Sequence, residues 1–332
     1  MLQILHISDL HLFIPGGLHD DFVQLKKNQG FPYRQLAQLY TFAWTPAQNA
    51  LADALHKVAG DQPALLILTG DIGALPYATA PDVEACFYSY VRSLIDVLAP
   101  SSEILIILGN HDWTVGQTTP FSTTSFDTVH QVRGGSRTAY FSQGVSKAII
   151  YLVDSTNAIL PATGEVSQAS LNYLRDHFRD GHNGAFVLRD QSLVSQDSYD
   201  QAIKVLVLHH YALPSTAYWG RLRWWEHLEL RLRNRPGLMR VCRNEIDILL
   251  FGHSHCPTFQ ARGGPIMIDA GSTLGTITVA SPPDAQFQRI LVQDPRTVQV
   301  EGYVWDGIKS DFVNCSRMPF RRNKTGVWSE AS

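Results

Sequence analysis

The chain has 332 residues, of which 45% are hydrophobic and 17% are charged, and its formal net charge is −3. This composition is typical of a globular protein with a substantial core, and the length allows one large domain or two medium ones. The small net charge excludes a global electrostatic attraction to nucleic acid or to an anionic membrane.

The cysteines and the amino terminus indicate a protein of the cytoplasm. The four cysteines are scattered and lack CxxC spacing, which predicts free thiols in a reducing compartment; they are Cys86, Cys242, Cys256 and Cys315. No segment approaches the roughly 18 continuous apolar residues of a membrane span, and the first residues lack a basic stretch and a cleavage site. We expect no membrane association.

Apolar runs of strand length alternate with helical patterns through most of the chain. The expected strands cover Gln3–Ser8, Ala64–Thr69, Glu103–Leu108, Ala148–Val153, Lys204–Leu208, Ile246–Phe251 and Pro265–Asp269. The expected helices lie near 47–59, 82–99, 168–179 and 237–244, and the stretch 287–305 resembles a closing antiparallel pair. Most strands lack polar alternation, as expected for strands buried on both faces. The alternation predicts α/β layers.

Polar or aromatic stretches interrupt this alternation. We expect one catalytic domain over 1–315, with insertions near 12–46, 113–140 and 181–235, and a flexible tail over 316–332. The first two insertions follow predicted site motifs directly, so they should surround the site and influence substrate choice. Within the third, residues 181–202 resemble a mobile surface excursion.

Five short motifs each follow a predicted strand. They read Asp9-Leu10-His11, Gly70-Asp71, Gly109-Asn110-His111-Asp112, His209-His210 and Gly252-His253-Ser254-His255. Because open α/β sheets build their sites at the carboxyl ends of strands, we expect these motifs to converge. Each motif is weak alone, but their conjunction in order makes coincidence very improbable.

The residue types indicate a pair of metal ions. Carboxylate, amide and imidazole ligands without a thiolate suit Mn, Fe, Zn or similar ions. Two such ions about 3.5–4 Å apart form the clamp used for in-line displacement at phosphorus. Asp71 is the best candidate for the carboxylate that bridges both ions, since Gly70 allows the sharp turn before it. The motifs therefore predict a phosphoesterase.

The remaining motif residues complete the predicted site. Asp9 and His11 are two residues apart, so on an extended stretch they would point the same way. His111, with Asp112 beside it, is placed to act as general acid, and Asp112 would hold its tautomer. The attacking group would be a hydroxide that bridges the metals. His210 faces away from His209 on a strand, which predicts a supporting or core position.

This ordered set of motifs resembles the calcineurin-like metallophosphoesterase superfamily over residues 1 to about 275. The sequences "ILHISDLHL", "GNHD" and "GHSH" are most similar to its class III cyclic-nucleotide phosphodiesterase branch. The resemblance implies a four-layer α/β/β/α sandwich of two mixed sheets. It also implies two metals, Mn or Fe and less often Zn or Ni. Purple acid phosphatases have a tyrosine ligand soon after the Gly-Asp motif, whereas here Ile72-Gly73-Ala74 follow, which disfavours that subfamily.

The resemblance assigns the ligands to the two metals. It implies that Asp9, His11, Asp71 and His255 bind the first metal. The implied ligands of the second are Asp71, Asn110, His209 and His253, and His111 is the implied acid.

Arginines are concentrated over 221–243, with three tryptophans close by. Arginine suits bidentate recognition of phosphate, so Arg221, Arg223 and Asn110 are candidate substrate contacts. A solvated amphipathic helix and a subunit interface are the competing interpretations of this stretch.

The sequence thus predicts a dinuclear metal-dependent phosphoester hydrolase. A phosphodiesterase acting on a nucleotide-like or other small diester is favoured over a monoesterase. The first alternative is a nuclease of the same superfamily acting with a partner, although the net charge disfavours nucleic acid as the substrate. The second is a scaffold without catalysis, which would lack ligands that are all present here.

Overall fold

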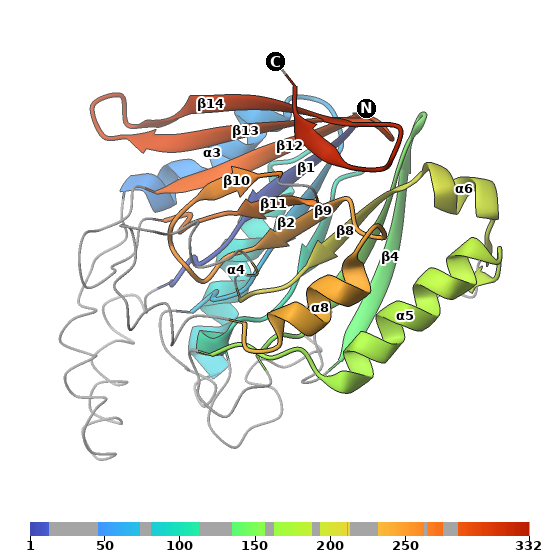
Figure 1. Ribbon diagram of the computed structural model, residues 1–332. Helices are drawn as coiled ribbons and strands as arrows, with labels where there is room; N and C mark the ends of the chain where they lie inside the picture. Colours follow the sequence, from blue (N-terminus) through green and yellow to red (C-terminus); the bar gives the residue numbers. More distant parts are fainter. Residues whose placement is uncertain are drawn as a thin grey trace, which may run out of the picture.

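The structure is a computed structural model with two large mixed β-sheets (Figure 1). It describes residues 1–12, 46–73, 81–112, 135–156, 163–187, 193–210, 212, 232–261, 264–274 and 285–331. The predicted insertions over 12–46 and 113–140 fall mostly outside these residues, but 136–140 belong to a strand. Within the described residues, no helix has the length and apolar character required to cross a membrane.

The first sheet has seven strands in the order β15-β14-β13-β12-β1-β2-β3. Their bounds are β1 Leu2–Ile7, β2 Ala64–Leu68, β3 Glu103–Ile106, β12 Gln286–Asp294, β13 Thr297–Asp306, β14 Asp311–Arg322 and β15 Trp328–Glu330. Strands β1, β2 and β3 are parallel, whereas β12 to β15 are antiparallel to their neighbours. The predicted closing pair over 287–305 is therefore confirmed as β12 and β13.

The second sheet has six strands in the order β10-β11-β9-β8-β5-β4. Their bounds are β4 Ser136–Gln143, β5 Ser146–Val153, β8 Ile203–Val207, β9 Ile248–Phe251, β10 Thr258–Gln260 and β11 Ile266–Asp269. The four inner strands β5, β8, β9 and β11 are parallel, and the two edge strands β4 and β10 are antiparallel to their neighbours.

Helices cover the outer face of each sheet. Their bounds are α3 Pro46–Ala59, α4 Pro81–Asp96, α5 Gln168–His182, α6 Gln196–Gln201 and α8 Arg235–Cys242. Residues of α3 and α4 share an apolar cluster with the first sheet, whereas α5, α6 and α8 share one with the second. Pro46 and Pro81 each open a helix, where the missing amide hydrogen costs nothing.

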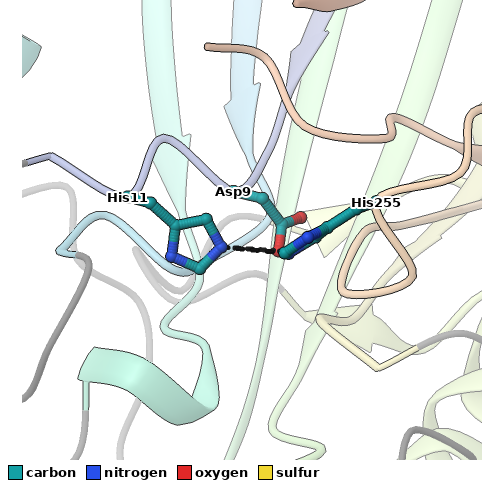
Figure 2. A group of neighbouring side chains, drawn as sticks. All are labelled: Asp9, His11 and His255. Atoms are coloured by element: carbon teal, nitrogen blue, oxygen red, sulfur yellow. Dashed lines mark hydrogen bonds and ion pairs between the residues drawn. The ribbon is translucent and has the colours of Figure 1, made fainter. Parts of the chain in front are cut away.

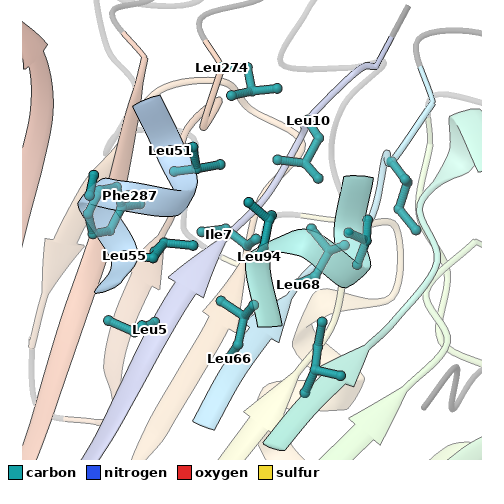
Figure 3. Packing of buried hydrophobic residues seen from close by; sticks show 14 of the residues in the cluster. Leu5, Ile7, Leu10, Leu51, Leu55, Leu66, Leu68, Leu94, Leu274 and Phe287 are labelled. Atoms are coloured by element: carbon teal, nitrogen blue, oxygen red, sulfur yellow. The ribbon is translucent and has the colours of Figure 1, made fainter. Parts of the chain in front are cut away.

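The two-residue period of the strands divides the core into layers. In β1, Leu5 and Ile7 pack toward α3 and α4 (Figure 3), whereas Leu2 and Ile4 pack into the cluster between the two sheets. Strands with apolar residues on both faces suit this arrangement, because each sheet is covered on both sides. The predicted four-layer α/β/β/α sandwich is confirmed.

All seven predicted strands and all four predicted helices are present, with ends that differ by up to three residues. The largest differences, of three residues, are at the ends of α4 and α5. The predicted strands that correspond to β1, β2, β3 and β8 run one or two residues too far, whereas the end of β9 was predicted correctly. The physical reason for the strand ends is that the last apolar residues already turn into the motif loops. Leu108, for example, is buried although β3 ends at Ile106.

The prediction of a mobile excursion over 181–202 was wrong for its described part. The segment contains the end of α5, the short strand pair β6 Phe186–Val187 and β7 Leu193–Val194, and α6. The rings of Phe186 and Tyr199 are buried and lie 5.5 Å apart between their centroids. Phe186 and Tyr199 pack into the apolar cluster of the second sheet and so keep this polar stretch close to it.

The prediction of a flexible tail over 316–332 was also wrong. Residues 311–321 pair with β13, with one register shift at Cys315, and β15 pairs with the end of β14. Trp328 is buried, and its indole Nε1 donates to Asp247 Oδ1 at 3.1 Å, an atom that also lies 2.9 Å from Arg322 Nη1. Since Asp247 precedes β9, this contact fastens the carboxy-terminal hairpin of the first sheet to the second sheet.

Replacing Trp328 with alanine should lower the free energy of unfolding by about 3–5 kcal/mol, the range for removing a large buried side chain. The loss would come from both the apolar contacts and the hydrogen bond to Asp247. Denaturant unfolding measures it directly, with Ser329→Ala on the exposed neighbour as control. Equal stability of the two variants would show that the hairpin contributes little to the fold.

Candidate metal centre

The five motifs converge at the carboxyl ends of the parallel strands of both sheets. Asp9 and His11 follow β1, Asp71 follows β2, and Asn110 follows β3 in a short 3-10 turn. His209 follows β8, and His253 and His255 follow β9. The structure thus brings together all seven predicted ligands, four from the first sheet and three from the second.

Five of these seven residues have a backbone φ in the left-handed region. They are Asp9, His11, Asp71, His253 and His255, with φ between 43° and 70°. The prediction that Asp9 and His11 lie on an extended stretch was therefore wrong, although their side chains do meet. Left-handed φ costs non-glycine residues about 1 kcal/mol or more each, and such residues cluster at functional sites. The surrounding hydrogen bonds have to hold this backbone in place.

One group of ligand atoms is formed by Asp9, His11 and His255 (Figure 2). His255 Nε2 lies 3.1 Å from Asp9 Oδ1 and 3.0 Å from His11 Nε2. His11 Nε2 lies 3.6 Å from the same Asp9 oxygen. Two ring nitrogens and a carboxylate oxygen that meet at such short range are the donor set of a divalent cation.

A second group of ligand atoms is formed around His209. Its Nε2 lies 2.9 Å from Asn110 Oδ1, 3.1 Å from His253 Nδ1 and 3.4 Å from Asp71 Oδ1. The other ring nitrogen, Nδ1, lies 2.7 Å from the carbonyl oxygen of Thr69. When Nδ1 carries the hydrogen for the bond to Thr69, the lone pair of Nε2 is available to bind a metal.

Asp71 lies between the two groups. Its Oδ1 faces His209 and accepts a hydrogen bond from the His111 amide at 2.9 Å, while its Oδ2 is 3.9 Å from His11 Nε2. Oδ2 is buried and finds no hydrogen-bond partner among the described residues. A buried carboxylate oxygen without such a partner is costly unless a cation compensates it. The residues present therefore fit two metals that share Asp71.

The electrostatics of the site favour a bound cation. Burial alone would raise the pKa of Asp71, but His209 and His111 outweigh it and lower this pKa below its ordinary value. Burial likewise opposes the ionisation of Asp9, yet hydrogen bonds with His11 and His255 keep its pKa low. Burial lowers the pKa of His11, which keeps its imidazole neutral and able to ligate. Burial would lower the pKa of His209 and of His255, but Asp71 and Asp9 outweigh it and raise both pKa values. Two buried anions thus attract positive charge into the site.

His111 is the most exposed of the histidines that surround Asp71. Its side chain is 30% exposed, and its Nε2 lies 3.9 Å from Asp71 Oδ2. The rings of His111 and His11 meet edge to face, with centroids 4.9 Å apart. Its ring therefore lies beside the ligand groups and also reaches solvent.

Asp112 has a role that the sequence did not predict. Its carboxylate accepts hydrogen bonds from the backbone amides of Ile72 at 2.9 Å, Gly73 at 3.2 Å and Gly109 at 2.8 Å. It thereby joins the loops that carry Asp71 and Asn110. That Asp112 also orients the His111 ring stays a prediction.

His210 occupies the supporting position predicted for it. It is buried, its Nδ1 lies 3.0 Å from Ser155 Oγ, and its ring centroid lies 4.4 Å from that of His253. The side chain of His210 also explains Gly164, because a Cβ there would collide with the imidazole. His210 therefore packs behind the second group of ligand atoms.

The candidate substrate contacts Arg221 and Arg223 lie outside the described residues. The base of their segment is described, however. Arg235 Nε donates to the carbonyl oxygen of Ala212, which lies three residues after His209. Ala212 and Arg235, which flank the segment that contains the two arginines, are therefore joined by a hydrogen bond. The prediction for Arg221 and Arg223 stays a prediction.

Gly252→Ala should displace ligands from the first group, because a Cβ at this position would collide with Ser8 Oγ and Asp9 Oδ2. We expect destabilisation of about 1–3 kcal/mol, the usual cost of overpacking, together with loss of bound metal. Elemental analysis and thermal unfolding measure the two effects. Gly264→Ala is the matched control, since its Cβ would meet nothing within 4 Å. Full metal content in Gly252→Ala would contradict the close approach seen here.

Comparisons with known proteins agree with this geometry. The family model for calcineurin-like phosphoesterases matches residues 2–257. A purple acid phosphatase from yellow lupin seeds has a similar fold, with a TM-score of 0.55 and 11% identity over 98% of this chain and 54% of that one. At this identity the similarity shows a shared fold and nothing more. Tyr77, the tyrosine nearest the Gly-Asp motif, lies outside the described residues.

Two further solved structures are more distant. A putative 5'-nucleotidase from Staphylococcus aureus matches with a TM-score of 0.48 and 12% identity over 96% of this chain and 53% of that one. Vacuolar protein sorting 29 from Cryptosporidium parvum matches with a TM-score of 0.43 and 12% identity over 96% and 98%. No curated protein matches the sequence. The family match covers most of the chain, includes strands of both sheets and contains every predicted ligand, so this chain belongs to the calcineurin-like phosphoesterase family.

Proposed function

We propose that this protein is a dinuclear metal-dependent phosphodiesterase that hydrolyses a nucleotide-like or other small diester. The observation that carries the proposal is Asp71, whose two carboxylate oxygens face two separate groups of ligand atoms and whose Oδ2 lacks a hydrogen-bond partner among the described residues. Metals bound there would supply a Lewis acid for the phosphoryl oxygens and an activated water. Oxygen and imidazole donors without a thiolate suit Mn, Fe, Zn or similar ions. The family resemblance favours Mn or Fe, with Zn or Ni as alternatives.

Residues of the chain would contact the substrate, transfer the proton and exclude water. Asn110 presents a neutral amide at the second group and can also contact a phosphoryl oxygen. His111, which is partly exposed, gives its proton to the leaving alkoxide, because it lies next to Asp71 and still reaches the side where a substrate enters. The buried ligands exclude water from the inner site, which strengthens every charge interaction there.

The preference for a diester and the similarity to the cyclic-nucleotide branch rest on the motif sequences. The nuclease alternative rests on the arginines of 221–243, of which Arg233 is about half exposed and lies 3.9 Å from Glu165. A cytoplasmic location is part of the proposal, and the free thiols of Cys242 and Cys315 agree with it.

Metal analysis of the purified protein, paired with hydrolysis of bis(p-nitrophenyl) phosphate with and without Mn, tests the proposal. We expect about two ions per chain and diester cleavage that a chelator abolishes and Mn restores. p-Nitrophenyl phosphate is the matched monoester, and faster cleavage of it would overturn the diester preference. Hydrolysis of cyclic nucleotides and of single-stranded nucleic acid is then compared, to distinguish a phosphodiesterase for small diesters from a nuclease. A protein that stays metal-free and inactive after reconstitution would support the scaffold instead.

A further inference from the structure

Asp269 is a buried carboxylate beside the metal centre that belongs to neither group of ligand atoms. It is the last residue of β11, is fully buried, and pairs across the sheet with Phe251, the last residue of β9. The motif that contains His253 and His255 begins directly after Phe251. No sequence motif pointed to Asp269, because a lone Asp at a strand end resembles an ordinary turn residue.

The carboxylate of Asp269 holds the middle residue of that motif. Ser254 Oγ donates to Asp269 Oδ2 at 2.6 Å, a short bond of the kind made by a hydroxyl to a carboxylate. The same hydroxyl oxygen accepts from the Cys256 amide at 3.0 Å. The second carboxylate oxygen, Oδ1, accepts from the Gly271 amide at 2.9 Å. Ser254 is thereby fixed toward the protein interior, with 1% of its surface exposed.

Fixing Ser254 determines where its two neighbours point. His253 and His255 flank it, and both have left-handed φ, of 70° and 55°. His253 Nδ1 reaches His209 in the second ligand group, whereas His255 Nε2 reaches Asp9 in the first. The buried Ser254 side chain lies between two residues with left-handed φ. Because left-handed φ is unfavourable for residues other than glycine, its hydrogen bonds are needed to keep His253 and His255 directed at separate ligand groups.

The loop after Asp269 holds Ser8 and Asp9, which belong to the loop after β1. Ser272 Oγ donates to the carbonyl oxygen of Asp9 at 3.1 Å. Thr273 exchanges two bonds with Ser8, accepting from its amide at 2.9 Å through Oγ1 and donating its own amide to the Ser8 carbonyl at 2.9 Å. The short segment 269–273 therefore contacts both loops that carry the first group.

We propose that Asp269 is the positioning residue of the metal centre and that its carboxylate acts through the Ser254 hydroxyl to aim His253 and His255 at different metals. The inference rests on the metal-binding part of the proposed function and does not depend on the substrate. It assigns to Asp269 no contact with metal or substrate. Its role is to order the loop that carries His253 and His255 during folding. The entropy of ordering this loop is then not lost again when metal binds.

The test compares Asp269→Asn, Ser254→Ala and the double variant by competition for Mn with a chromogenic chelator. Each single variant should weaken Mn binding by about 10–100-fold, the usual effect of removing a partner of a metal ligand. The double variant should be no weaker than the worse single variant, because both changes break one linked contact. Additive losses would show that Asp269 and Ser254 act separately, and would overturn the inference.

Asp247→Asn is the matched control. Asp247 is also a buried carboxylate of the second sheet, but it precedes β9 and bonds Trp328, Arg322 and the Lys204 amide instead of a ligand loop. It should lower thermal stability while leaving Mn affinity unchanged. Equal Mn affinity in the wild type and Asp269→Asn would overturn the inference and leave the proposed function intact. A wild type that binds neither Mn nor Fe would overturn the proposed function itself.

Discussion

Asp71→Asn is expected to abolish stable metal binding and to lower kcat/KM for the diester by about 10³-fold or more. The carboxylate faces both ligand groups, and its Oδ2 is buried without a hydrogen bond from any described residue. An amide keeps the shape but removes the charge that holds two cations close together. A loss of about 4 kcal/mol of transition-state stabilisation corresponds to the stated factor. Elemental analysis and steady-state kinetics measure the two effects.

The control for this variant is Asp53→Asn, which changes an exposed carboxylate on α3. It should keep about two ions per chain and full activity. Retention of both ions in Asp71→Asn would mean that the two ligand groups bind metal independently. In that case Asp71 would not be the shared ligand.

His111→Ala is expected to separate chemistry from metal binding. Turnover of a diester with a poor leaving group should fall by about 10²–10⁴-fold, the contribution of a positioned general acid. A p-nitrophenolate leaving group needs no proton, so hydrolysis of the chromogenic diester should fall far less. The metal content should stay near that of the wild type, because each ligand group is complete without His111.

Two outcomes would contradict this assignment. Full activity of His111→Ala on the poor leaving group would exclude a general acid at this position. Loss of one metal would instead make His111 a ligand, an arrangement that the close approach of His11, Asp71 and His111 also allows. His182→Ala, on an exposed histidine of α5, controls for the removal of an imidazole.

The layers of the fold and the convergence of the site were predictable because both depend on simple periodicities. Uninterrupted apolar runs such as Leu65–Leu68 are buried on both faces, so their strand assignment followed from composition alone. The carboxyl ends of parallel strands meet at one edge of a sheet, which placed the motifs together. What failed was local conformation: Asp and His adopt left-handed φ more often than most residues, but that weak preference did not single out Asp9 and His11.

Tertiary contacts explain the other failures. The segment over 316–332 is polar and includes Pro319, so its residues resemble a tail, yet Trp328 is buried and donates a hydrogen bond to Asp247, 81 positions away. Asp269 could be recognised only after Ser254 was seen to donate to it. In each case the deciding partner lies far away in sequence, where local propensity carries no information.

The order of the ligands along the chain has a consequence for how the protein matures. Asp9 and His255, which meet at 3.1 Å, are separated by 246 positions, and the ligands between them alternate with the strands of both sheets. Contacts of such sequence separation form late, after the loops between them have closed. No amino-terminal fragment ending before β9 contains the complete set. Because each ligand group takes residues from loops of both sheets, neither metal can be fully coordinated before the two sheets have docked.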